Sequence, residues 1–156
     1  MAGNDIFLDL KGVEGESKDS AHPKTIQLES FSFGCRLPRD EATLQPIGKR
    51  HHTPLLCVKH TDAATSRLLQ ALFTNRKIDK GQLIVRKAGP SQQEFLTVDL
   101  EDVYVSSFSV SAPSASLPME SFELVYGKIT VTYKEQTALG ILGGPITAQD
   151  DLRTTT

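Results

Sequence analysis

Residues 5–34 decide the fold, and they read DIFLDLKGVEGESKDSAHPKTIQLESFSFG. Apolar residues recur at every second position from Ile6 to Leu10, and again at Ile26 and Leu28. A period of two is typical of strands that bury one face. The glycines between these runs allow the backbone to turn. The stretch therefore predicts two strands joined by a charged loop.

The rest of the chain predicts more strands and one helix. Apolar residues at Ala64, Leu68 and Leu72 recur at four-residue spacing, which is the pattern of a helix that buries one face. Extended runs with strand-like alternation are expected over residues 55–60, 82–87, 94–100, 103–111 and 120–134.

A change of apolar parity marks two of the expected strands. It falls at Gly127 and between Leu28 and Phe31, and it indicates a bulge or bend where one strand serves two sheets. Bent strands and a single helix predict a mainly β fold, a small antiparallel β-barrel or two-sheet sandwich with the helix packed outside. We expect one domain over residues 1–134. Residues 135–156 hold few large apolar side chains and are expected to form a flexible C-terminal tail.

Residues 36–53 are expected to form a long, exposed loop. They include Pro38, Pro46 and Gly48 and show no sustained apolar period. Loops longer than about 12–15 residues without secondary structure are uncommon in compact domains and often serve binding. This extended loop is therefore a candidate contact arm.

The composition excludes several classes of partner. The 156 residues carry 17 basic and 19 acidic side chains, so no attraction to nucleic acid or an anionic membrane is expected. No apolar run approaches the roughly 20 residues of a membrane span, and the first residues lack the features of a signal peptide. We expect a cytoplasmic protein whose export uses no cleaved leader. Cys35 and Cys57 are expected to be reduced structural thiols.

The sequence contains no convincing motif for catalysis, a cofactor or a metal. A phosphate-binding loop fails because Thr43 and Arg50 stand where glycine and a hydroxyl residue are required. The adjacent His51 and His52 would point to opposite sides of an extended segment and could not share a metal. Acid–base chemistry and an ordinary solvated turn both fit the loop residues Glu14, Glu16, Asp19 and His22. We expect no enzyme activity.

Several separate segments carry a family resemblance. Residues 82–89 read QLIVRKAG and residues 103–107 read VYVSS, an Arg-Lys-Ala-Gly turn and a Val-Ser-Ser strand. With residues 5–34, 59–73 and 123–133, these segments resemble the Hcp (haemolysin-coregulated protein) family of bacterial type VI secretion. The resemblance spans most of residues 5–134. It is weakest in the 36–53 loop, in the loop around Pro113 and in the C-terminal tail.

The resemblance implies a structural role rather than catalysis. In the Hcp family, subunits close into homo-hexameric rings, and the rings stack into a tube. A contractile sheath expels this tube, with a spike protein at its tip, into a target cell, and the lumen can hold small effector proteins. Head-to-tail pairing around a closed rotation would also cover exposed strand edges.

Two sets of residues are candidates for these contacts. Ser30 and Ser32 are expected opposite the core-facing Phe31, on the face that lines the lumen in the family, although a plain surface position fits them equally. Charged residues of the loop are predicted to take part in ring stacking, namely Arg39, Asp40, Glu41, Lys49 and Arg50. The alternative is that this loop is only solvated.

Two other functions stay open at this point. A monomeric ligand-binding β-barrel would contain a buried apolar cavity. A small hydrolase would gather Glu16, Asp19 and His22 in one pocket. Neither function has a supporting motif in the sequence.

Overall fold

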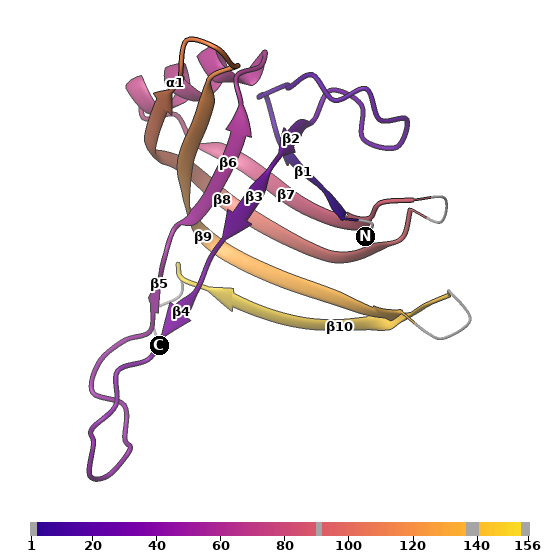
Figure 1. Ribbon diagram of the computed structural model, residues 1–156. Helices are drawn as coiled ribbons and strands as arrows, with labels where there is room; N and C mark the ends of the chain where they lie inside the picture. Colours follow the sequence, from indigo (N-terminus) through magenta and orange to yellow (C-terminus); the bar gives the residue numbers. More distant parts are fainter. Residues whose placement is uncertain (1–2, 90–91, 137–140, 154–156) are drawn as a thin grey trace.

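One antiparallel sheet curls into a barrel in the computed structural model, which describes residues 3–89, 92–136 and 141–153 (Figure 1). The strands of this sheet are β1 (Asn4–Leu10), β2 (Ile26–Leu28), β3 (Ser30–Ser32), β6 (Leu55–His60), β7 (Ile78–Lys87), β8 (Glu94–Ser111), β9 (Met119–Gln136) and β10 (Leu142–Asp151). Their order is β2-β1-β7-β8-β9-β6-β3, and β10 pairs with β9. Only Glu29 separates β2 from β3, so the two ends of this order meet and the barrel closes. The predicted antiparallel barrel is confirmed.

The barrel interior is filled by apolar side chains from the surrounding strands. One row across paired positions consists of Leu8, Leu83, Val98 and Val131, and the first three have no exposed surface. Burying each such side chain stabilises the fold by roughly 1.5–3 kcal/mol. A slip of one residue would turn the whole row to solvent, and this cost fixes the register of the strands.

The helix α1 (Ala64–Phe73) packs outside the barrel and covers one end of it (Figure 1). Its buried residues are Ala64, Leu68 and Ala71, and Leu72 packs partly buried against the core. The predicted apolar stripe is therefore the face that docks. Just before the helix, the Asp62 carboxylate accepts the amide N–H of Ala64 at 2.9 Å, which satisfies one free donor of the first turn.

The parity change at Gly127 is present, but β8 is a single strand rather than the two runs expected over residues 94–100 and 103–111. Asp102 of β8 has φ 52°. In the facing part of β9, the buried position after Tyr126 is Ile129, so the face that points to the core changes parity across Gly127. Glu101 pairs with Lys128 and Val103 with Tyr126, so the bend occurs inside a continuous ladder. A Cβ atom at Gly127 would lie 2.9 Å from Arg153 Cδ, because the Arg153 side chain crosses this point.

The flexible tail predicted for residues 135–156 is wrong where the structure describes it. β9 continues to Gln136, and β10 pairs with it from Leu142 to Asp151. β6 pairs only with residues 119–124 of β9, so the second half of that edge of β9 is left for β10. Main-chain hydrogen bonds hold β10, and these leave no apolar pattern in the sequence. Residues 137–140 and 154–156 of the predicted tail lie outside the described residues.

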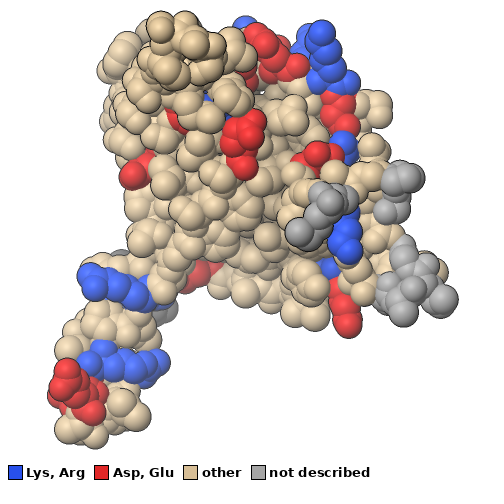
Figure 2. Space-filling view, in the orientation of Figure 1, with Lys and Arg blue, Asp and Glu red and all other residues tan. Residues whose placement is uncertain are grey.

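Residues 36–53 form an arm that protrudes from the barrel at the end away from α1 (Figures 1 and 2). At its root, β4 (Cys35–Arg36) pairs with β5 (His51–His52) in a two-stranded antiparallel sheet. All of residues 41–50 are exposed, as expected for a long loop. The arm is nevertheless held by hydrogen bonds of its own, as described below.

Candidate functional site

The arm is a hydrogen-bonded hairpin. The Ile47 amide donates to the Pro38 carbonyl at 2.9 Å, and the Asp40 amide donates to the Gln45 carbonyl at 2.8 Å. Arg39 adds a hydrogen bond from Nη1 to the Leu44 carbonyl at 2.9 Å. These bonds join the outgoing and returning halves, so the arm has a defined shape without a partner.

Asp40 organises the tip of the arm. Its Oδ1 accepts the amide N–H groups of Thr43 at 2.8 Å and Ala42 at 2.9 Å. These two hydrogen bonds hold the pKa of Asp40 below its ordinary value, because they favour the ionised carboxylate. Asp40 is thus a turn-forming residue as well as a charge at the tip.

Asp150 of β10 fixes the root of the arm. Its Oδ2 accepts a hydrogen bond from Arg50 Nε and lies 2.7 Å from His52 Nε2. Arg50, and after it His52, hold the pKa of Asp150 below its ordinary value. Tyr126 packs edge-on against the His52 ring, with centroids 5.8 Å apart, and donates to the Thr53 carbonyl at 3.3 Å. The returning half of the arm is therefore tied to the last two strands.

Three large apolar side chains of the arm are exposed. Leu44 is 65% and Ile47 63% exposed, and Leu37 is exposed to a smaller extent. Single apolar residues on a protein surface are ordinary, but three on one protruding hairpin make that hairpin a candidate contact surface. The arm therefore combines apolar and charged groups in a shape suited to protein–protein contact.

A serine-rich face lies on the outside of the barrel, opposite the core. Phe31 packs against the core, and its neighbours Ser30 and Ser32 are exposed. Register places these serines in two rows across β3, β6, β9 and β8, namely Ser30–Val58–Ser121–Ser109 and Ser32–Leu56–Glu123–Ser107. The hydroxyls of Ser109 and Ser121 lie 2.7 Å apart. Five of these eight positions are serines, and the others are Val58, Leu56 and one acidic residue, Glu123.

An open, mainly apolar groove lies between the root of the arm and β10. Its volume is about 270 Å³, and its lining comes from Phe33, Gly34, Cys35, His52, Ile129, Val131, Ala148, Gln149 and Asp150. The groove exists because β9 leaves β6 at Leu124 and continues beside β10, so the inner face of the sheet extends past the closed part of the barrel. Cys35 is a free, exposed thiol, whereas Cys57 is a free thiol in the core whose pKa burial raises.

The loop between β1 and β2 is fastened to the outside of the sheet. Arg86 is almost fully buried and pairs with Asp19 through Nη1 at 2.9 Å and Nη2 at 2.5 Å. Its Nε donates to Asp5 at 3.2 Å, and its guanidinium carbon lies 4.8 Å from the centre of the Phe7 ring. The hydrogen bonds from Arg86 are the largest cause of the lowered pKa of Asp19. This carboxylate therefore holds a loop in place and is not free for acid–base work.

A buried ion pair fixes α1 to the barrel. Lys59 has no exposed surface, Glu120 is 1% exposed, and Lys59 Nζ lies 2.6 Å from Glu120 Oε1. Lys59 also donates to Asp62 at 2.8 Å, and Thr61 and Thr65 donate to Glu120 at 2.7 and 2.8 Å. Burial by itself would raise the pKa of Glu120, but these hydrogen bonds outweigh it and lower the pKa overall. This ion pair was not predicted from the sequence.

Comparison with known proteins identifies the family of this fold and arm. A family model described as "Type VI secretion system effector, Hcp" matches residues 7–133. The chain belongs to the Hcp family. Protein hcp1 of Pseudomonas aeruginosa is 29% identical over 147 residues, which cover 91% of both chains. The Major exported protein of the same organism is 26% identical over 129 residues, covering 77% of this chain and 75% of that protein.

Solved structures agree with the Hcp assignment. A structure described as a type six secretion system protein has a TM-score of 0.91 at 25% identity, and the match covers 96% of both chains. Hcp1 from Salmonella typhimurium has a TM-score of 0.79 at 28% identity, covering 98% of this chain and 96% of that one. This Hcp chain is therefore a tube subunit of type VI secretion, as its sequence resemblance implied.

The five charged arm residues predicted for stacking divide into two kinds. Arg39, Asp40 and Arg50 are engaged within the subunit, in the hairpin or with Asp150. Glu41 and Lys49 are exposed on the arm. The arm thus brings all five together on one protrusion, but only part of its charge is presented to a neighbour.

The two alternative functions are not favoured for this Hcp chain. In the described part of the chain, core side chains such as Leu8 and Val98 occupy the barrel interior, which does not favour a ligand-binding barrel. A hydrolase pocket is not assembled, since Asp19 pairs with Arg86 while His22 pairs with Glu94. Glu16 lines a separate hollow beside His60. Within the described ranges, no helix has the length and apolar character to cross a membrane, and no cluster of metal-ligating side chains occurs.

Proposed function

We propose that this Hcp chain assembles into homo-hexameric rings that stack into an exported tube and carry small effector proteins in the lumen. It acts without catalysis and without a cofactor. The subunit is made in the bacterial cytoplasm and is exported from the cell. A relative of similar length is named Major exported protein, which supports export. A contractile sheath and a spike protein are the further partners.

The single observation that carries the lumen role is the serine-rich face. Ser30 and Ser32 stand on the outside of a rigid ladder, beside further serines of β8 and β9. Small hydroxyl side chains leave room for cargo and offer donors and acceptors to many protein surfaces. Such a surface suits a channel that holds several different effectors weakly.

The Ser32→Gln variant tests the lumen role. The longer amide side chain on a surface-exposed position should leave ring formation unchanged and reduce the amount of effector that co-purifies with the ring. Ser66→Gln, at an exposed position on α1, is the matched control. Unchanged effector retention in Ser32→Gln, with rings visible by negative-stain electron microscopy, would remove Ser30 and Ser32 from the lumen. A strictly monomeric wild-type protein at high concentration would overturn the ring itself.

The arm carries the proposed stacking of rings. Its hairpin shape is already formed in one subunit, so little conformational entropy is lost when it binds the next ring. Charge reversal in the double variant Glu41→Lys/Lys49→Glu, which keeps the Arg50–Asp150 pair, should shorten tubes and leave single rings intact. Tube length is measured by electron microscopy at low and at 0.5 M salt, and tubes of wild-type length in both conditions would contradict the role of these two residues.

A further inference from the structure

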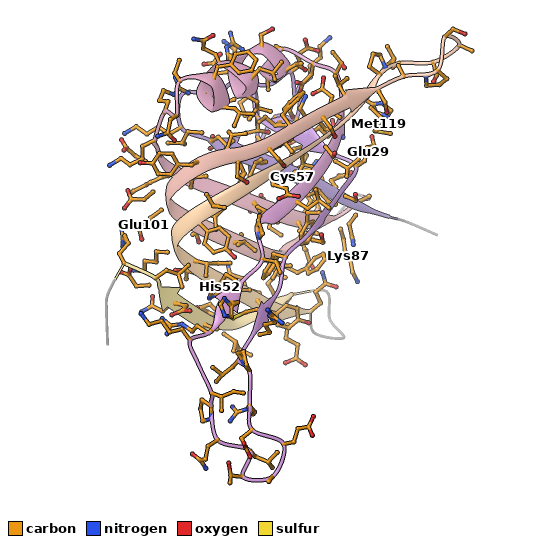
Figure 3. All side chains as sticks on the ribbon, turned by 90° about the vertical axis from the view of Figure 1, so that its left-hand side faces the viewer. Glu29, His52, Cys57, Lys87, Glu101 and Met119 are labelled. Carbon is orange, nitrogen blue, oxygen red and sulfur yellow. The ribbon has the colours of Figure 1, made fainter. Side chains whose placement is uncertain are left out.

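Two apolar surfaces lie at opposite ends of the subunit. Figure 1 places the arm and β10 at one end and α1 with the β8–β9 turn at the other. Figure 3 shows the same separation, with His52 at the root of the arm and Met119 at the far end of the barrel. A molecule with unlike, complementary surfaces at its two ends forms head-to-tail contacts, which close into a ring when the rotation between copies permits.

The first surface is the groove between the root of the arm and β10. Phe33, Ile129, Val131 and Ala148 supply its apolar lining. Its one carboxylate, Asp150, is already paired with Arg50 and His52. An apolar occupant would therefore bury this groove without leaving Asp150 as an unpaired charge.

The second surface is the turn that joins β8 to β9. Residues 112–118 read APSASLP and carry no charge. Leu117 is 69% exposed, and Val110 and Met119 at the ends of the flanking strands are exposed as well. Register pairs Val110 with Glu120 and Ser111 with Met119, so Val110 and Met119 lie on opposite faces of the hairpin. The hairpin end is apolar on both sides and uncharged at its tip.

We propose that the β8–β9 turn of one Hcp subunit inserts Leu117 into the groove beside β10 of the neighbouring subunit in the same ring. This inference rests on the proposed hexameric ring and names two surfaces that close it. The charges agree, because an uncharged turn meets a groove whose carboxylate is internally neutralised. The helix end at Phe73 is a poorer occupant despite its exposure, since Arg76 and Lys77 follow it. Six repeats of the contact would cover both apolar surfaces of every subunit.

The chain provides its own probe for this contact. Cys35 is exposed and lines the groove, whereas Cys57 is buried and therefore inaccessible to cross-linking. The Leu117→Cys variant should therefore form a disulfide with Cys35 of the next subunit when assembled rings are oxidised, since a disulfide requires Cα atoms within about 7 Å. A non-reducing gel should show a ladder that ends at six linked chains. The ladder should be lost in Leu117→Cys/Cys35→Ser.

Phe73→Cys is the matched control, because Phe73 is 73% exposed at the same end of the molecule. Rings that yield no more cross-linked product from Leu117→Cys than from Phe73→Cys would overturn the contact and leave the proposed ring standing. A ladder that continues past six chains would place the contact between rings and would also overturn it. Ala148→Asp, which adds a charge to the groove, should convert rings to folded monomers in light scattering. Wild-type protein without rings would instead refute the proposed function.

Discussion

Replacing Lys59 by Met should destabilise the subunit by about 3–5 kcal/mol, because the Glu120 carboxylate would stay buried without its cation. Thr61 and Thr65 would still donate to Glu120, but these neutral hydrogen bonds do not replace the charge of Lys59. A domain of ordinary size has a free energy of unfolding of about 5–15 kcal/mol, so the loss is a large share of the total. The chain has no Trp, so urea unfolding is followed by far-UV circular dichroism.

The dependence of this loss on pH gives the sharper test. In the wild type the pKa of Glu120 is lowered in the folded state, so its contribution is present above the unfolded pKa of 4.5 and is lost as the pH falls through the folded value. Without Lys59, burial dominates and raises the folded pKa above 4.5. The variant then gains stability on acidification, and the gain fades as the pH rises through its folded pKa. The difference between variant and wild type should therefore shrink from pH 7 to pH 4.

Two control variants make the test specific. Lys59→Met/Glu120→Leu removes both charges and should recover most of the stability, because an apolar pair of similar volume tolerates burial. Lys11→Met breaks the exposed Lys11–Asp79 pair, at 3.6 Å, and should change stability by less than about 1 kcal/mol. An equal loss of stability in Lys59→Met at pH 4 and pH 7, or a double variant no more stable than the single one, would show that an unpaired Glu120 carboxylate is not the cause.

Two further variants test the arm and the first loop. Asp150→Asn should change the global free energy of unfolding by less than about 1 kcal/mol, since the pair with Arg50 is partly exposed. Amide hydrogen exchange over residues 36–53 should become faster. Unchanged exchange would show that Asp150 does not fix the arm. Gly15→Ala should cost about 1–3 kcal/mol, because its Cβ would lie 2.4 Å from the Thr25 carbonyl oxygen. Gly144→Ala is the control, because a Cβ there meets nothing within 4 Å, and it should unfold at the wild-type urea midpoint. Equal midpoints for the two alanine variants would contradict the predicted clash at Gly15.

Strand period and helix spacing predicted the barrel, because these elements bury one face and the sequence records that face. β1, β6 and most of β8 and β9 follow from alternation, and α1 follows from Leu68 and its neighbours. β10 could not be predicted in this way, since residues such as Thr147, Ala148 and Gln149 are held by pairing with β9 and not by burial. Backbone hydrogen bonding is independent of side-chain type, so an edge strand can lack any apolar signal.

The buried ion pair did leave a signal that was overlooked. Lys59 has the same parity as Leu55 and Cys57 in β6, and Glu120 has the same parity as Phe122 in β9. A charged residue at a buried position of a strand requires an opposite charge nearby. Two such residues of opposite sign on different strands predict both a pairing and a register. The candidate arm residues were harder to resolve, because Arg50 meets Asp150 from a strand that the sequence did not reveal.

The single residue between β2 and β3 affects how the barrel can open. Because β2 pairs with β1 and β3 pairs with β6, Glu29 connects two ladders from opposite ends of the strand order. Loss of one ladder leaves residues 26–32 anchored by the other, so fraying at one side does not detach this segment. Each of the two ladders contains only three paired positions, fewer than any other pair of strands in the barrel wall. Local opening of the barrel should therefore begin at this junction.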